Sequence, residues 1–415
     1  MIENTFSILE PKCDSQLLKK KLASFYNGHP DSGANSFNYE PSPVLVQPEY
    51  FQRMGQLCEV LNKALIGVVN AYFKDERIRA IYSLDAQLEQ ILLMAEGRAY
   101  STGLYRPDLV LNTEGQPKIC EIGARYPING WMLSLYLNLT CSEPDIIDQE
   151  LAAPIPGMET FIDKLGQFFD SGTPIALVHD NEKGTEVFNL LAEFRKIGID
   201  YIDVTPADIT IENGKIYAAG INVSNFIFEL DREELRKFNP EVLSHIIRHG
   251  NYINDVRTLT LVHDKRILAV LYDYAIMNDL LQMEEYEFLR QFLIPTFALN
   301  TVQKREEVIH SKKNWLVKET SGGRGIGIYI KDETTPEAWA NIINEEWPRY
   351  MVQEYVDQQL FDAIGTINEP MNLVGMILCY NDHCFGPGLS RGSSANIVNA
   401  HGGRAAIFPT MVSRK

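Results

Sequence analysis

The stretch WLVKETSGGRGIGIYI, Trp315–Ile330, places Lys318 at the end of an apolar run and soon follows it with Gly322, Gly323 and Gly325. Glycines carry no Cβ, so the backbone N–H groups of such a loop can turn toward phosphate oxygens. The lysine adds a compact positive charge. The dinucleotide fingerprint and the P-loop both open into a helix, whereas this loop joins two strands. We predict a phosphate-binding hairpin, and a surface hairpin with a flexible tip is the alternative.

About 30 residues further on, the apolar segment YMVQEYV ends with Gln353, Glu354 and Tyr355. A strand that leads into a hinge can present backbone N–H and C=O groups, together with a side-chain amide, to the edge of an adenine. An amphipathic strand with its polar side chains in water is the alternative, because alternation is the default strand pattern. The order and spacing of the two segments favour a nucleotide site.

Two carboxylates, Asp108 in RPD and Glu121 in CEIGAR, stand at the ends of a second strand pair. Hard carboxylates on adjacent strands, with phosphate oxygens and water, are suitable ligands for nucleotide-bound Mg²⁺. Arg106 and Arg125 flank them and could neutralise phosphate charge. Cross-strand salt bridges, for example between Arg106 and Glu121, are the alternative interpretation.

Near the C-terminus, Arg391 lies at the end of an expected strand and is followed by a loop of small residues containing Asn396, Asn399 and Arg404. Small residues beside an arginine suit an anionic phosphoryl or carboxylate group. A glycine-rich surface loop is the alternative. The sequence contains no nucleophile elbow such as G-x-S-x-G, so covalent catalysis by the protein is not indicated.

The elements that position these residues follow from local patterns. Helical periodicity extends over about 49–96, and the segments DLVL and KICEIG read as a β-hairpin around the turn NTEGQP. Residues 172–255 alternate strands with a helix, which predicts a small Rossmann-like parallel sheet. Its first turn, HDNEKGTE, lacks the G-x-G-x-x-G fingerprint, so we expect a platform for substrate and no dinucleotide site. The segment from His263 to Pro295 reads as helical, and the end of the chain is rich in strands.

Composition limits the class of partner. At 415 residues the chain can form two or three domains, and its net charge of -17 with no basic patch argues against nucleic acid and acidic membrane surfaces. The six scattered cysteines fit reduced thiols, and the N-terminus shows no signal-peptide pattern. These features predict a cytoplasmic protein that acts on small soluble substrates, with a homodimer as the default assembly.

Taken in order, the motifs resemble an ATP-grasp enzyme, and their inverted order resembles the circularly permuted group typified by the ligase domain of glutathionylspermidine synthase. The similarity extends over roughly residues 100–410. The expected class is α/β (α+β), a circularly permuted ATP-grasp fold with a small Rossmann-like domain and a glycine-rich lid. The expected divisions are a helical cap at 1–95, the metal- and phosphate-binding half of the core at 96–170, the Rossmann-like domain at 171–258, the lid and adenine hinge at 259–360, and returning core strands at 361–415.

The resemblance implies a role for each matching residue. Asp108 and Glu121 become Mg²⁺ ligands, and Gln353, Glu354 and Tyr355 form the adenine hinge. The implied contacts to phosphate or to the reaction intermediate are Lys265, Lys318, Arg106 and Arg391. One departure is that Gly123 stands where the group places an asparagine; Asn129 lies close enough in sequence to substitute.

The implied activity is that of a carboxylate–amine ligase that uses ATP and Mg²⁺ and forms an amide through an acyl phosphate. A small-molecule phosphotransferase and a non-catalytic nucleotide-binding protein are the two alternatives. The resemblance does not identify the carboxylate or the amine, which could be amino acids or peptides.

Overall fold

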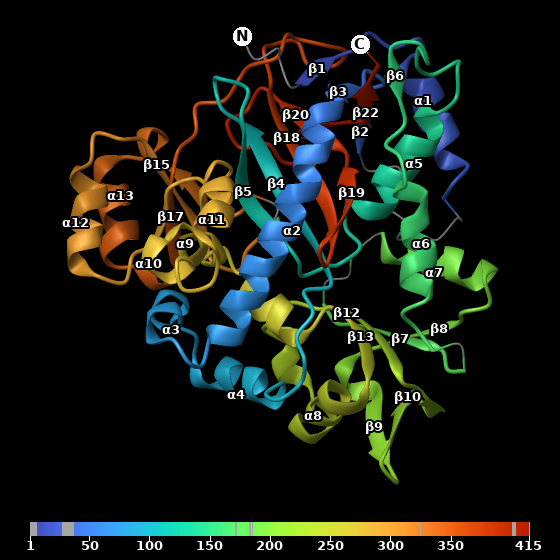
Figure 1. The fold of residues 1–415 in the computed structure, drawn as a ribbon, viewed down its shortest axis with the longest axis vertical. Helices are drawn as coiled ribbons and strands as arrows, with labels where there is room; N and C mark the ends of the chain where they lie inside the picture. The colour runs from blue at the N-terminus through green and yellow to red at the C-terminus, as the bar shows by residue number, and fades with distance from the viewer. Residues whose placement is uncertain are drawn as a thin grey trace.

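The structure is a computed structural model that describes residues 6–26, 37–170, 172–181, 184, 186–323, 325–400 and 404–414. Its mixed α/β architecture confirms the expected class, with several separate sheets (Figure 1). Within these ranges no helix is both long and apolar enough to cross a membrane.

The central sheet carries most of the predicted site. It runs in the order β2 (Asn38–Tyr39), β21 (Ala406–Phe408), β20 (Ser390–Ser393), β18 (Asn372–Tyr380), β4 (Leu104–Leu111) and β5 (Pro117–Gly123), with β19 (His383–Pro387) also paired to β18. The predicted hairpin is confirmed as the antiparallel pair β4–β5, in which Asp108 lies opposite Glu121. Gly115 in its turn has φ +73°, a conformation that favours glycine.

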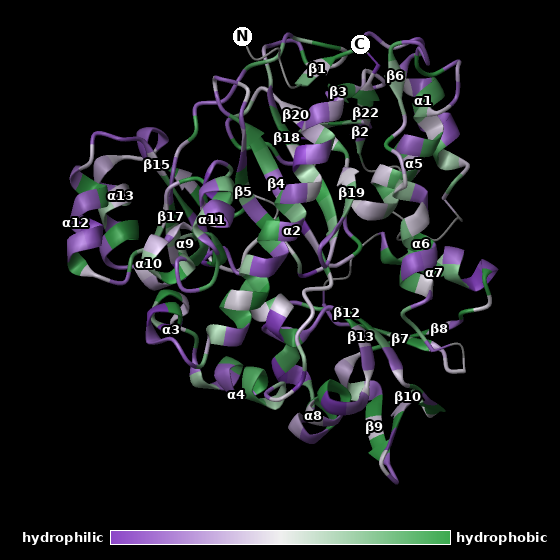
Figure 2. Cartoon of the chain, in the orientation of Figure 1, coloured by the Kyte–Doolittle hydropathy of each residue, from purple (hydrophilic) through white to green (hydrophobic). Residues whose placement is uncertain are grey.

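Helix α2 (Pro48–Ala71) crosses one side of this sheet (Figure 1). Its predicted apolar face, which includes Leu57, Leu61 and Leu65, is fully buried in one cluster with strand residues such as Leu109. Figure 2 shows the central strands as mostly apolar, whereas α2 alternates between apolar and polar residues. Burial of this one face therefore fixes the helix on the sheet.

A four-stranded sheet joins the two ends of the described chain. Its order is β1 (Phe6–Ile8), β3 (Val44–Val46), β22 (Thr410–Ser413) and β6 (Ala152–Ala153). β3 pairs with β22, and β2 pairs with β21, both in parallel. The early strands are therefore built into the same sheets as the last strands. Near this sheet lie α1 (Ser15–Ala23) and α5 (Trp131–Cys141), followed along the chain by α6 (Phe161–Gly166) (Figure 1).

The predicted parallel sheet is confirmed, in the order β13 (Asn251–Ile253), β12 (Asn225–Glu229), β7 (Ile175–His179) and β8 (Tyr201–Val204). Helices α7 (Val187–Lys196) and α8 (Pro240–His249) belong to this unit. Next to this sheet, β9 (Ile209–Glu212) and β10 (Lys215–Ala218) form a hairpin around an Asn-Gly turn, and β11 (Ile221–Asn222) pairs with β10. Asn213 and Gly214 both have positive φ, as the tightest hairpin turns require.

The glycine-rich segment lies on a separate sheet with the order β14 (Thr296–Ala298), β17 (Tyr350–Glu354), β15 (Trp315–Glu319) and β16 (Ile328–Ile330). Helices α12 (Val302–His310) and α13 (Pro336–Asn344) lie beside it (Figure 1). Trp315, Val317, Trp339 and Val352 form a small core of its own between helices and sheet.

The helical segment expected from His263 to Pro295 is divided into α9 (Ile267–Tyr272), α10 (Tyr274–Met277) and α11 (Met283–Arg290). Asp273 has an extended conformation, and its side chain caps α10, which explains the first break. Further helices are α3 (Glu76–Tyr82), α4 (Ala86–Met94), a π-helical turn (Thr258–Val262) and short 3₁₀ turns at Met158–Thr160, Pro206–Asp208, Glu234–Lys237, Lys331–Glu333 and Trp347–Arg349.

Candidate functional site

A cavity of about 290 Å³ contains most of the predicted site residues. Residues from the central sheet, the glycine-rich hairpin and the hinge line it together: Arg106, Asp108, Glu121, Lys318, Gly323, Gly325, Gln353, Glu354, Tyr355 and Arg391. Lys265 and Gly322 lie beside it, where Lys265 Nζ donates a hydrogen bond to the carbonyl oxygen of Gly322. Residues more than 280 positions apart in sequence are thus brought together, as shown by the contact of Arg391 with Asp108, which are 283 apart.

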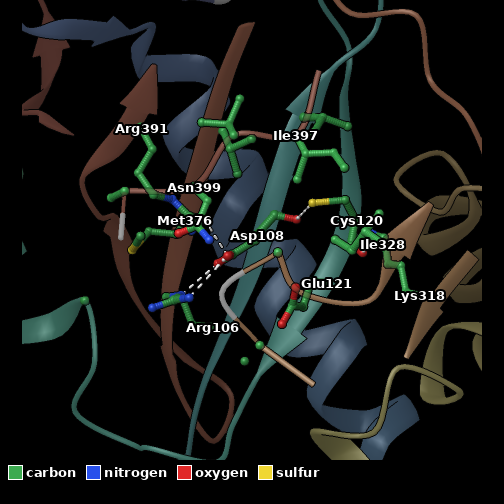
Figure 3. Close-up of a pocket in the computed structure, with 18 of the residues that line it drawn as sticks. Arg106, Asp108, Cys120, Glu121, Lys318, Ile328, Met376, Arg391, Ile397 and Asn399 are labelled. Atoms are coloured by element: carbon green, nitrogen blue, oxygen red, sulfur yellow. Dashed lines mark hydrogen bonds and ion pairs between the residues drawn. The ribbon is translucent and has the colours of Figure 1, made fainter. Parts of the chain in front are cut away.

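Asp108 is held between two arginines (Figure 3). Arg106 Nε donates to Asp108 Oδ1 at 2.7 Å and Arg106 Nη2 to Oδ2 at 3.2 Å, while Arg391 Nη2 donates to the same Oδ2 at 2.5 Å. The partner of Arg106 is therefore Asp108 and not Glu121, the partner named in the salt-bridge alternative. Arg391 is the second residue of β20, nearer the start of its strand than its expected end. Charge-assisted pairs of this kind fix the direction of both guanidinium groups.

Glu121 retains a carboxylate that is open to a ligand. Within the described residues no hydrogen bond reaches it, and its one ion pair, to Lys265 Nζ, is long at 3.8 Å. Burial acts to raise the pKa of Glu121, but the nearby cations have the larger combined effect, so the pKa lies below its usual value. These cations are Lys265, Lys318, Arg106 and Arg391. Glu121 is therefore ionised at neutral pH.

These residues can be tested for their fit to Mg²⁺. The described residues contain no group of three or more His, Cys, Asp or Glu side chains arranged for a metal. Mg²⁺ at a nucleotide site, however, commonly uses one or two carboxylates and completes its shell with phosphate oxygens and water. Glu121 fits this requirement as it stands, whereas Asp108 has both oxygens in contact with arginines.

Gly123 leaves no side chain where the group that the motifs resemble places an asparagine. A Cβ at Gly123 would lie 3.5 Å from Arg106 Nη2, which is ordinary contact. Asn129 does line the cavity; its backbone oxygen accepts from Arg106 Nη1 at 2.8 Å and its Oδ1 has no hydrogen-bond partner among the described residues. Gly130 must be glycine, because its φ is +91° and a Cβ would lie 2.8 Å from Arg106 Nη1.

Lys318 links β15, the strand before the glycine-rich loop, to the central sheet. Its side chain is buried, and Nζ donates to the carbonyl oxygen of Cys120 at 2.7 Å and to Gln353 Oε1 at 3.0 Å. Burial lowers the pKa of Lys318. Gln353 Nε2 in turn donates to Thr296 Oγ1 at 3.0 Å, so the oxygen and the nitrogen of this side-chain amide both have hydrogen-bond partners within the protein.

The hinge therefore differs in detail from the predicted adenine edge. The N–H groups of Glu354 and Tyr355 donate to the carbonyl oxygens of Pro295 and Asn314, at 2.8 and 3.0 Å. The next residue, Val356, lines the cavity, and no hydrogen bond from its N–H occurs within the described residues. Sequence reasoning did not single out Val356. The wall beside it is apolar, with Ile294, Leu316, Ile328 and Ile330.

The glycine-rich loop is compact. Ile326 N–H donates to the Gly323 carbonyl oxygen at 3.2 Å, and Glu319 N–H donates to that of Gly327 at 3.1 Å. Gly325 and Gly327 have φ values of +70° and +69°. A Cβ on Gly327 would lie 2.6 Å from Glu319 Cδ, so this position also requires glycine.

Other residues that sequence reasoning missed lie at the far end of the cavity. Glu186 accepts the N–H groups of Gly130 at 2.7 Å and Leu133 at 2.8 Å, so it caps the start of α5, and burial raises its pKa. Nearby Glu229 is fully buried; desolvation raises its pKa to about 8, although Gly184 N–H donates to it. Glu229 is the last residue of the parallel strand β12, and Glu186 directly precedes α7, the helix that follows β7 along the chain. Parallel sheets bind ligands at the carboxyl ends of their strands, and this position was the available signal.

His263 was also missed. It lines the cavity two residues before Lys265, and Ala124 N–H donates to its Nδ1 at 3.3 Å. Burial, reinforced by nearby positive charges, lowers the pKa of His263 well below the ordinary value, so the ring is neutral. A lone histidine inside an apolar segment, LTLVHD, gives no sequence signal for this position.

Comparison with known proteins gives one family and one curated relative. The AnkG N-terminal domain family matches residues 57–261. The chain is 23% identical over 436 residues to "ATP-grasp enzyme ankG" from Aspergillus thermomutatus, with 90% of this chain and 88% of the relative covered.

Two solved structures show weak likeness. One is a protein described as a gamma-glutamylcysteine synthetase from Methylobacillus flagellatus, with TM-score 0.46, 11% identity and coverage of 85% of this chain and 88% of that chain. The other is D-alanyl-alanine synthetase A from Vibrio cholerae, with TM-score 0.27, 12% identity and coverage of 50% and 68%.

Proposed function

This chain is a relative of an ATP-grasp enzyme over nearly its whole length, as its motifs predicted, and from that premise we propose that it is an ATP-dependent carboxylate–amine ligase. The γ-phosphoryl group of ATP passes to a substrate carboxylate, which gives an acyl phosphate and ADP. An amine then attacks the acyl carbon, the amide bond forms, the C–O bond to phosphate breaks and a proton is lost from the nitrogen. We also propose that the ATP-grasp motifs of this chain follow the circularly permuted order.

The observation that carries the proposal is the convergence of charges on one cavity with an apolar end. Lys318 comes from the lid, Arg391 from β20, and Arg106 and Glu121 from the β4–β5 hairpin, and all four line the same space. Phosphoryl transfer needs little covalent help from a protein, because positioning and charge neutralisation lower most of its barrier. The site offers these two contributions and no nucleophilic side chain is required.

Each residue has a role that its contacts support. Lys265 and Lys318 neutralise phosphate charge, because the positive charges of both act on Glu121 and Lys265 Nζ is bonded to the glycine loop at Gly322. Arg106 and Arg391, aligned by Asp108, orient the transferred phosphoryl group or the substrate carboxylate. Bound Mg²⁺ would supply further neutralisation of the phosphates, and Glu121 would hold it.

The apolar walls and the lid would exclude water. An acyl phosphate hydrolyses in water, so a ligase must keep it enclosed until the amine arrives. The adenine ring would lie against Ile294, Leu316 and Val356, which line the same cavity. The glycine loop would close over the phosphates, with its backbone N–H groups as donors.

Release of ADP and phosphate tests the proposal. The protein is incubated with Mg-ATP and pooled amino acids and short peptides as carboxylates, with and without pooled amines. We expect amide product and ADP only when both pools are present. Lys318→Ala should abolish ADP release, whereas Lys312→Ala, an exposed lysine six residues earlier, should leave it unchanged.

The alternatives give different results in the same experiment. A phosphotransferase would accumulate a stable phosphorylated product without any amine. A non-catalytic nucleotide-binding protein, the alternative suggested by Gly123, would bind ATP and release no ADP with any mixture. Either result would contradict the ligase proposal.

A further inference from the structure

His263 carries a ring nitrogen that no protein group satisfies. The residue follows the π-helical turn Thr258–Val262, and its side chain lies in the cavity wall. It is only 8% exposed, and within the described residues Nε2 has no hydrogen-bond partner. A buried donor or acceptor without a partner destabilises the protein, because it has lost its hydrogen bonds to water. Because His263 lies in the wall of the cavity, a bound ligand can supply the missing partner of Nε2.

The contacts of the ring show which nitrogen carries the proton. Ala124 N–H donates to Nδ1 at 3.3 Å, so Nδ1 is the acceptor and the proton of the neutral ring is on Nε2. Burial and the charges of Lys265 and Arg125 keep the ring neutral. Nε2–H is therefore a neutral donor without an acceptor.

The groups around His263 favour an anionic acceptor. Lys265 is bonded to the glycine loop through its backbone N–H to Thr320 at 2.9 Å and through Nζ to Gly322. Arg125, a second cation near the ring, forms an ion pair with Asp231 at 2.6 Å. Asp231 also accepts the N–H of Glu233 at 2.9 Å, so its carboxylate already has its own partners.

We propose that Nε2–H of His263 donates a hydrogen bond to a phosphate oxygen of the bound nucleotide. This assignment rests on the proposed ATP site and adds to it a residue outside the predicted set. The neutral N–H complements the nearby lysines, because it makes a directional hydrogen bond to the phosphate oxygen without adding a further positive charge. A donor fixed by the Ala124 contact loses little conformational entropy when the ligand binds.

Two substitutions separate the donor from its structural contact. His263→Asn keeps a side-chain oxygen near the place of Nδ1, where it can accept from Ala124 N–H, but has no group at the place of Nε2. His263→Gln reaches further and puts an amide N–H near the place of Nε2. Calorimetric titration with Mg-AMPPNP, which needs no carboxylate or amine substrate, measures the effect, with adenosine as the phosphate-free control.

We expect His263→Asn to weaken AMPPNP binding by about 10- to 100-fold, the range for a hydrogen bond to a charged group. His263→Gln should stay within a few-fold of the wild type, and adenosine affinity should not change in either variant. Unchanged AMPPNP affinity in His263→Asn would overturn the proposal, as would equal losses for AMPPNP and adenosine. If the wild type itself does not bind AMPPNP, the proposed nucleotide site is at fault, and this result is recognised before any variant is made.

Discussion

Asp108 and Glu121 lie opposite each other on one hairpin, but their surroundings leave the two carboxylates with different capacities to bind a metal ion. Asp108 has two arginine partners, whereas Glu121 has one ion pair, with Lys265 at 3.8 Å. A carboxylate that already accepts three strong hydrogen bonds has less to offer a metal than one that accepts none. Glu121 is therefore the residue on which the Mg²⁺ requirement should depend most.

Replacing Glu121 with glutamine should raise the Mg²⁺ concentration needed for half-maximal ADP release by at least about 10-fold, since a neutral amide is a weaker ligand for a hard cation. The measurement is a Mg²⁺ titration of ADP release at saturating ATP. Glu114→Gln, in the exposed turn of the same hairpin, is the matched control and should have no effect. Equal Mg²⁺ requirements in the wild type and Glu121→Gln would remove Glu121 from the metal site.

Lys318→Ala should lower turnover by about 100-fold or more, because a buried positive charge beside the phosphates is lost. It should also lower stability by about 1–3 kcal/mol, because Gln353 Oε1 and the Cys120 carbonyl oxygen lose a buried donor. Urea unfolding and ADP release measured on the same preparation separate the two effects. Turnover close to that of the wild type would exclude Lys318 from the reaction.

Glu229 predicts a dependence of stability on pH. Its folded pKa is raised to about 8 by desolvation, so between the ordinary glutamate pKa and about pH 8 the folded state holds a proton that the unfolded state has released. Stability must then fall as pH rises through this window, by up to about 1.4 kcal/mol per pH unit. Glu229→Gln, which does not titrate, should reduce this fall, whereas exposed Glu212→Gln should not. Urea unfolding at about pH 6 and pH 8 measures it, and parallel profiles for wild type and Glu229→Gln would contradict the assignment.

At the scale of elements, α2 offers a direct test of helix formation. Gly55 lies inside this helix, and a Cβ at that position would meet nothing within 4 Å. Gly55→Ala should therefore raise the free energy of unfolding by about 0.5–1 kcal/mol, because alanine loses less backbone entropy in a helix. Gly327→Ala should do the opposite, since φ is +69° and the site is crowded. Urea unfolding of both variants checks the pair, and stabilisation by Gly327→Ala would contradict the loop geometry.

Local patterns predicted most elements, because a hairpin or an amphipathic helix is specified by residues close in sequence. The Asn-Gly turn, the β4–β5 hairpin and the parallel sheet all follow this rule. The hydrogen bonds of the Gln353 side-chain amide could not be predicted, since its partners, Lys318 and Thr296, are 35 and 57 residues away in sequence. His263 was missed for the same reason: its partner Ala124 is 139 residues away.

At the scale of the whole molecule, the first strands are joined to the last. β2 pairs with β21 and β3 with β22, and no short-range pattern could predict these pairings. Their effect is that residues around 38–46 hold β21 and β22, the two strands that follow Arg391 along the chain, and β21 itself pairs with β20, which carries Arg391. The early segment thus supports the candidate site through the strand β21 beside Arg391.

Removal of residues 1–46 should therefore disrupt the fold and not merely alter substrate choice. The deletion takes away β1, β2 and β3 and exposes the backbone edges of β21 and β22. We expect the truncated chain to be insoluble or to lose its cooperative unfolding transition, as followed by circular dichroism. A soluble truncated chain with the same melting temperature as the full chain would show instead that these residues form a separable cap.

The hydrogen bonds of Lys318 have a consequence for how the two ends of the proposed nucleotide site affect each other. One ammonium group is bonded both to the wall near the phosphates and to the Gln353 amide near the hinge. When Lys318 turns to a phosphate oxygen, Gln353 Oε1 loses its donor and becomes free to accept another. In the proposed ATP site, the triphosphate and the base would then be energetically linked through a single amide, so that occupancy of one end would favour binding at the other.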